Sequence, residues 1–185
     1  DENDERFTLD LSSALNALMA DSQGLGMILD DDVAPSLMIG DVTVTEGNSG
    51  QTAATFTVSL SSASSKTVSL DFATADSSAK EPSDYSATSG SLTFAPGETA
   101  KSISVAVQGD VIDESNEQFL INLSNAVNTT IGDAQAIGTI TNDDTSPKLS
   151  INDVTVSEGD AGITDATFTL TLNSPSTQAV TVNYA

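Results

Sequence analysis

The sequence lacks three residue types that carry much of protein chemistry, namely cysteine, histidine and tryptophan. Without cysteine there is no disulfide framework, no thiolate nucleophile and no thiolate-bound zinc. Without histidine the usual general base is missing, and a Ser-His-Asp triad cannot form. Oxygen ligands remain, and they suit hard cations such as calcium better than zinc or copper.

Basic residues are also scarce, because 5 Lys and Arg stand against 27 Asp and Glu, for a net charge of −22. Proteins hold nucleic acid mainly through Lys and Arg, so we expect no nucleic-acid partner. Anionic membrane surfaces are repelled for the same reason, and no apolar run is long enough to span a bilayer. We therefore expect no direct membrane insertion. No signal peptide is visible, and the chain starts inside a motif that recurs later, so we expect an internal part of a longer polypeptide.

The chain repeats itself with a shift of 112 residues, because the acidic stretch around Asp113 also begins the chain at Asp1. Residues 1–73 overlay residues 113–185 without a gap, and about half of the positions are identical. This period is too long for a solenoid repeat and predicts a string of complete domains. Asp-rich segments that end in proline mark the boundaries, because proline keeps the chain extended and blocks strand pairing. The predicted parts are the end of one repeat (1–35), a complete repeat (36–147) and the start of the next (148–185).

Within the complete repeat, apolar and polar residues alternate in seven short segments, which predicts an all-β antiparallel sandwich. The alternation of Leu37 and Ile39 continues in Val42 and Val44 after a slip of one residue, which predicts a β-bulge at Gly40–Asp41. Only Ala14–Met19 has helical spacing. Its counterpart one period later has poor helix propensity, so both are predicted to be loops, the first with one helical turn.

Several motifs together resemble a Calx-β domain. They are Asp41–Gly47, Asp71–Asp76, Ser83–Tyr85, Gly90–Glu98, Asp113–Phe119 and Gly138–Asp144. The resemblance implies tandem immunoglobulin-like sandwiches of seven strands, with calcium ions bound at one tip near the C-terminal end of each domain. Calcium accepts six to eight oxygens in flexible geometry, which offsets the repulsion among clustered carboxylates.

The resemblance also implies which carboxylates bind the ions. Asn142 stands where the preceding repeat has Asp30, so ion number or affinity is expected to differ between repeats. Asp84 and Tyr85 are interpreted as a turn residue and a packing anchor, and solvated surface charge is the alternative reading of the acidic loops. The implied metal ligands are Glu46, Asp76, Asp110, Asp113, Glu114, Glu117, Asp143 and Asp144 in the complete repeat, Asp1, Glu2, Glu5, Asp30, Asp31 and Asp32 in the preceding one, and Glu158 in the following one.

Similar tandem units without cysteine favour a bacterial surface protein over the sodium–calcium exchanger class, whose paired domains are more divergent and sit in the cytosol. The expected function is a calcium-binding structural repeat of a long secreted or cell-surface protein, such as an adhesin, surface layer or filament, with calcium stiffening the inter-domain joints. The alternative is an adhesive module that recognises a glycan or protein ligand. An enzyme is not expected, because nothing forms a substrate cleft around the acidic loops. The expected partners are neighbouring repeats of the same chain, and identical chains in a filament or surface assembly.

Overall fold

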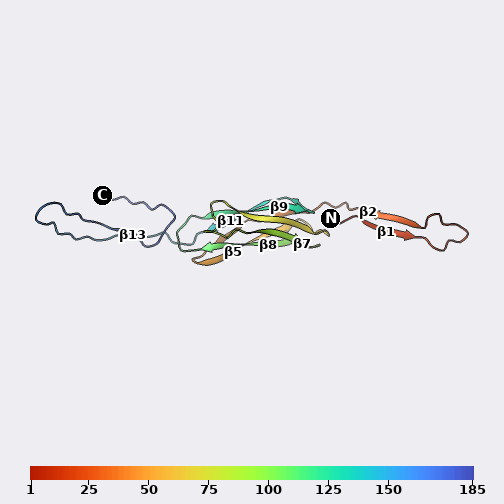
Figure 1. The fold of residues 1–185 in the computed structure, drawn as a ribbon, viewed down its shortest axis with the longest axis horizontal. Helices are drawn as coiled ribbons and strands as arrows, with labels where there is room; N and C mark the ends of the chain where they lie inside the picture. The colour runs from red at the N-terminus through yellow and green to blue at the C-terminus, as the bar shows by residue number, and fades with distance from the viewer.

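A computed structural model describes all residues, 1–185, and every regular element in it is a strand. A β-sandwich occupies the middle of an elongated molecule (Figure 1). A hairpin of β1 (Glu5–Asp10) and β2 (Gln23–Ile28) projects from one end, and the segment with β12 (Leu149–Ile151) and β13 (Leu170–Leu172) projects from the other (Figure 1). No helix with the length and apolar character needed to cross a bilayer is present. The predicted all-β class is confirmed.

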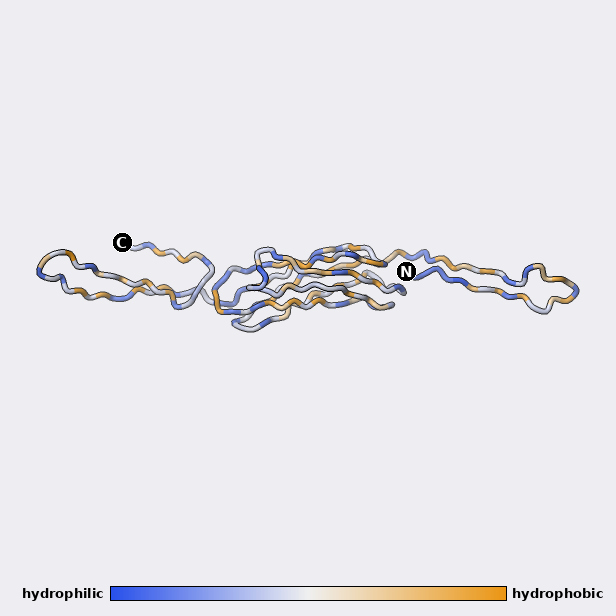
Figure 2. The backbone as a smooth tube through the Cα atoms, in the orientation of Figure 1, coloured by the Kyte–Doolittle hydropathy of each residue, from blue (hydrophilic) through white to orange (hydrophobic).

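Two sheets form the sandwich, one in the order β10-β3-β5-β8 and the other in the order β4-β11-β9-β6-β7. Inward positions of the long strands are buried at every second residue, as along β5, which is what a sandwich with one wet face per sheet requires. Figure 2 shows the same alternation of hydrophobic and hydrophilic residues along the chain. The strands are β3 (Ser36–Ile39), β4 (Val42–Thr45), β5 (Gly50–Leu60), β6 (Val68–Asp76), β7 (Ser89–Phe94), β8 (Ala100–Gly109), β9 (Glu117–Val127), β10 (Thr130–Ile131) and β11 (Gln135–Thr141).

The slip at Gly40–Asp41 is a crossing between sheets, so the predicted β-bulge is wrong. β3 pairs antiparallel with β5, whereas β4 pairs parallel with β11 in the opposite sheet. A bulge would keep both halves in one sheet. The Asp41 carboxylate secures the crossing, because its Oδ1 accepts a hydrogen bond from the Ile137 N–H at 2.8 Å.

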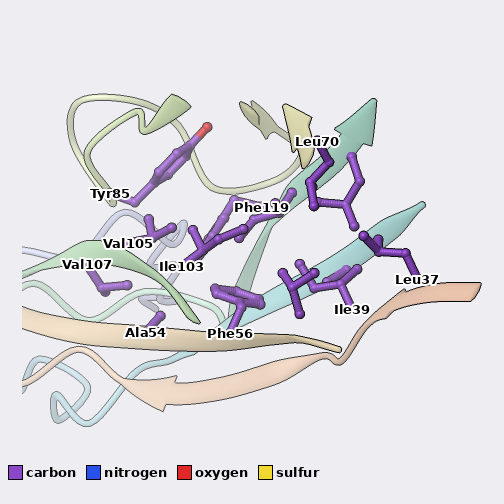
Figure 3. Close-up of a cluster of buried hydrophobic side chains, with 14 of the residues drawn as sticks. Leu37, Ile39, Ala54, Phe56, Leu70, Tyr85, Ile103, Val105, Val107 and Phe119 are labelled. Atoms are coloured by element: carbon purple, nitrogen blue, oxygen red, sulfur yellow. The ribbon is translucent and has the colours of Figure 1, made fainter. Parts of the chain in front are cut away.

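Aromatic rings hold the centre of the core (Figure 3). Phe119 meets Phe56 edge to face, with ring centroids 5.8 Å apart, and stacks on Tyr85 at 4.7 Å. Tyr85 is 1% exposed, so it is the packing anchor that the sequence predicted. Gly138 lies opposite Phe119 in the β9–β11 ladder, and a Cβ at Gly138 would collide with the phenyl ring. This pair therefore requires glycine.

The projecting hairpin repeats the geometry of β9 and β11. Phe7 pairs with Gly26 as Phe119 pairs with Gly138, and a Cβ at Gly26 would again collide with the ring. The loops that follow also match, because residues with positive φ stand at equivalent places one period apart: Ser13 and Asn16, then Asn125 and Asn128. The helical turn expected within Ala14–Met19 is absent, since left-handed residues interrupt any helix there.

Candidate metal centre

Strand directions carry the acidic loops to one end of the sandwich. The ends of β4 and β11 share an edge because the two strands are parallel, so Glu46 lies beside Asn142 and the residues after it. β9 runs antiparallel to β11, and its first residue, Glu117, pairs with Ile140 at that same edge. β8 ends at Gly109, opposite Gly50, and leads into the acidic loop. We call this end the acidic tip, and it comprises Glu46, Asp84, Asp110, Asp113, Glu114, Glu117, Asp143 and Asp144.

Backbone contacts fix Glu46 against the neighbouring segments. Its N–H donates to the Thr141 carbonyl at 3.3 Å, and the Gly47 N–H donates to Asp143 Oδ1 at 3.1 Å. A Cβ at Gly109 would collide with the Glu46 and Gly47 carbonyls, so glycine allows this approach. Glu46 is 5% exposed, and its carboxylate accepts no hydrogen bond from the protein. A largely buried glutamate whose carboxylate has no protein donor favours a cation.

Three half-buried carboxylates converge elsewhere on the acidic tip. One oxygen from each of Asp84, Glu114 and Glu117 lies within 4.8 Å of the other two, a spacing that a single cation could bridge. Asp84 is the residue that the sequence reasoning missed. It does serve as a turn residue, because its Oδ2 accepts the Lys80 N–H at 2.6 Å. The sequence feature that could have indicated this role is the neighbouring Tyr85. Its buried ring holds the adjoining Asp84 carboxylate at the acidic tip.

Burial and mutual repulsion raise the pKa of four carboxyls in the acidic tip. The pKa of Glu46 rises to about 7, first through burial and then through the charges of Glu114, Asp110, Asp144 and Asp143. Burial, followed by the Asp84 carboxyl, raises the pKa of Glu117 to about 7. The pKa values of Glu114 and Asp144 are also raised, again mainly by burial. Such shifts mark a site whose negative charge is poorly compensated by the protein alone.

Asp144 provides a direct test of whether a cation fits here. Its Oδ2 is buried and has no hydrogen-bond partner. The rest of Asp144 is well held, because its N–H donates to Asn142 Oδ1 at 3.2 Å. A buried, unpartnered carboxylate oxygen among other carboxylates matches the all-oxygen donor set that calcium prefers. Asp84, Glu114 and Glu117 lie close enough together to hold one ion, and Glu46 and Asp144 offer further uncompensated carboxylates in the acidic tip.

Two other predicted ligands, Asp76 and Asp110, already accept hydrogen bonds from the protein. Asp76 Oδ1 accepts hydrogen bonds from the Tyr85 hydroxyl at 2.8 Å and from the Glu81 N–H at 3.1 Å. These donors lower the pKa of Asp76, so its charge is already compensated within the protein. Asp110 is exposed, with Oδ1 accepting the Ile112 N–H at 2.7 Å, yet its charge helps to raise the pKa values of Glu46 and Glu114.

The acidic residues of the first segment gather at the opposite end of the sandwich. Asp1 and Asp30 contact Ser64–Lys66, the loop between β5 and β6, and we call this contact the N-terminal junction. The equivalent contact one period later joins Asp113 to Ser176–Gln178, and we call it the C-terminal junction. The side chains of Glu2, Glu5, Asp31, Asp32 and Glu158 are exposed.

The family model for the Calx-beta domain matches residues 30–145, and the chain belongs to this family. Calx-beta domains bind Ca2+, and they are regulatory modules rather than catalytic ones. Mouse sodium/calcium exchanger 1 is 49% identical over 61 residues, which are 33% of this chain and 6% of that protein. Rat sodium/calcium exchanger 2 is 41% identical over 68 residues, 37% of this chain and 7% of that protein. The chain thus spans only a small part of these relatives.

Solved structures have the same fold. The apo-form Calx CBD1 domain superposes with a TM-score of 0.52 at 24% identity, covering 60% of this chain and all of that domain. CBD12 from CALX1.2 superposes with a TM-score of 0.54 at 25% identity, covering 64% of this chain and 49% of that one.

These comparisons correct the expected location. The tandem units without cysteine favoured a secreted or cell-surface bacterial protein over the exchanger class. The two relatives named above are mammalian sodium/calcium exchangers, the class whose paired domains sit in the cytosol. The expectation of an extracellular location is therefore wrong. The acidic loops and the absence of cysteine did not distinguish between these locations.

Proposed function

We propose that the sandwich binds calcium at the acidic tip, with Asp84, Glu114 and Glu117 around one ion and with Glu46 and Asp144 as further ligands, and that bound calcium stiffens the C-terminal junction. One observation carries the proposal: Asp113 belongs both to the acidic loop and to the junction. Its carbonyl accepts hydrogen bonds from Ser176 Oγ at 3.0 Å and from the Thr177 N–H at 3.1 Å. Asp113 is only 8% exposed, so water competes little with these bonds.

The physical link is the conformation of the acidic loop. In the absence of a cation, the carboxylates of this loop repel Glu46 and Asp144, as their raised pKa values indicate. Calcium would replace that repulsion by shared coordination and reduce the number of conformations open to the loop. Asp113 lies directly before Glu114 in the chain. A fixed Glu114 would therefore fix the acceptor to which the next segment is bound.

The adhesive alternative is less well supported within the sandwich. Sugar recognition commonly uses exposed aromatic faces, because the rings stack on apolar sugar surfaces. Phe56, Phe94 and Phe119 are at most 1% exposed, and Tyr85 is equally buried. Phe72, the remaining aromatic residue of the sandwich, is half-buried and packs against the core. No group of exposed rings therefore supports sugar stacking, and we retain the calcium-stiffened module.

Small-angle scattering of the 185-residue protein tests the proposal, with calcium and then with a calcium chelator. We expect calcium to narrow the distribution of interatomic distances, because the segment after Asp144 samples fewer orientations. The matched control is the double variant Glu114→Gln and Glu117→Gln, in which calcium should leave the distribution unchanged. Identical distributions for the unmodified protein in calcium and in chelator would refute the stiffening.

A further inference from the structure

The two junctions are built from the same hydrogen bonds. Ser64 Oγ donates to the carbonyl and Oδ2 of Asp1 at 3.2 and 3.0 Å, and Ser176 Oγ donates to the same two atoms of Asp113 at 3.0 and 3.3 Å. The next N–H of each loop donates to the same aspartate carbonyl, from Ser65 at 3.0 Å and from Thr177 at 3.1 Å. Each serine Oγ also accepts the N–H two residues on, at 3.0 and 3.1 Å. The backbone geometry of the junction therefore recurs one period later.

An ion pair distinguishes the N-terminal junction from the C-terminal one. Lys66 Nζ lies 2.7 Å from Asp1 Oδ1 and 3.2 Å from Asp30 Oδ2, so one ammonium serves two carboxylates. One period later both partners change, to Gln178 in place of Lys66 and to Asn142 in place of Asp30. The two substitutions remove one positive and one negative charge together, which keeps the balance of charge at the junction.

The charged groups of the N-terminal junction are largely shielded from water. The side chains of Asp1, Asp30 and Lys66 are 5%, 13% and 23% exposed. Charge-assisted hydrogen bonds in such surroundings are stronger than exposed ones, and losing one partner leaves a carboxylate poorly solvated. At the C-terminal junction, Asp113 Oδ1 instead receives a long hydrogen bond from Asn142 Nδ2, at 3.5 Å.

We infer that Lys66 is an ion-pair latch that holds the N-terminal junction closed without a divalent cation, and that the C-terminal junction has no such latch. The inference deepens the proposed function and rests on it in one respect, namely that calcium acts on the C-terminal junction. Calcium would then control only the second of two consecutive junctions. The latch also makes the two junctions specific for different preceding segments. The loop with Lys66 fits a segment that carries Asp30, and the loop with Gln178 fits one that carries Asn142.

Amide hydrogen exchange of the 185-residue protein in chelator tests the latch, because exchange measures local opening. In the unmodified protein we expect the Ser65 amide to exchange more slowly than the Thr177 amide. Lys66→Gln should speed exchange at Ser65 about tenfold, as expected for the loss of a partly buried charge-assisted bond. Lys66→Arg should keep the protection, and core amides of β5 and β8 should not change in either variant.

The reciprocal substitutions introduce the ion pair at the C-terminal junction. They should increase amide protection there, which a folding defect cannot do. Gln178→Lys combined with Asn142→Asp should slow exchange at Thr177 in chelator. An unchanged Ser65 rate in Lys66→Gln, or an unchanged Thr177 rate in the reciprocal double variant, would overturn the latch. Calcium added to the unmodified protein reports separately on the proposed function. If calcium does not protect Thr177, the stiffening fails while the latch still stands on the chelator data.

Discussion

Removing the charge of Glu46 should have opposite effects with and without calcium. We consider Glu46→Gln, which keeps the shape of the side chain. The Glu46 carboxylate accepts no hydrogen bond from the protein, so the substitution breaks none. In calcium-free protein it removes a charge that is buried and repelled by Glu114 and Asp110. With calcium it removes a ligand.

The magnitude follows from the pKa of Glu46, which folding raises from 4.5 to about 7. The folded protein then binds a proton that the unfolded chain releases within this window, so stability falls as the pH rises from 4.5 to about 7. At a pH above this window, the full pKa shift corresponds to a loss of about 3 kcal/mol in the free energy of unfolding. Glu46→Gln should therefore stabilise the calcium-free protein by about 1–3 kcal/mol at high pH, and very little at low pH.

Thermal unfolding followed by circular dichroism, in chelator, measures this effect at about pH 8 and at about pH 4. We expect the midpoint of the variant to rise by roughly 5–10 °C at the higher pH only. With calcium at the higher pH, the stabilisation by the ion should be smaller in the variant. Glu158→Gln is the matched control, because Glu158 occupies the equivalent place one period later, accepts the Thr164 hydroxyl on its carbonyl as Glu46 accepts Thr52, and is exposed.

Two results would refute this reasoning. One is a calcium-free variant that is less stable than the unmodified protein at the higher pH. The other is an equal change in midpoint at both pH values, which would show that the Glu46 charge is not the cause.

Two further predictions concern residues beside Glu46. Asp84→Asn should weaken calcium binding by at least tenfold in calorimetric titration, because Asp84 shares the three-carboxylate cluster with Glu114 and Glu117; an unchanged affinity would remove Asp84 from the ligand set. Tyr85→Phe should lower the free energy of unfolding by about 1–2 kcal/mol in urea titration, because it removes the hydrogen bond to Asp76 and leaves that carboxylate short of a donor. The stack on Phe119 should survive this change, so an effect as large as that of Tyr85→Ala would contradict the assignment to the hydroxyl.

The all-β class and the location of most strands were predictable from the sequence, because alternation with a period of two specifies which residues face the core. Phe56, Phe119 and their neighbours are buried as the pattern indicates. The repeat was likewise predictable, since it is a property of the sequence. The structure adds that the repeated residues form matched ladders, in which Phe7 pairs with Gly26 and Phe119 pairs with Gly138.

The tertiary structure alone decided where the chain changes sheets and which carboxylates meet. A one-residue slip at Gly40 is compatible with a bulge or with a crossing, and the choice depends on partners nearly 100 residues away. Asp84 joins Glu114 and Glu117 because Tyr85 packs on Phe119, whereas Asp76 stays ionised and accepts hydrogen bonds from the Tyr85 hydroxyl and the Glu81 N–H. Composition and motifs thus determined that this chain would gather carboxylates for a hard cation. Long-range packing determined which of them remain uncompensated, because only burial and proximity decide whether a charge is solvated, paired or left for an ion.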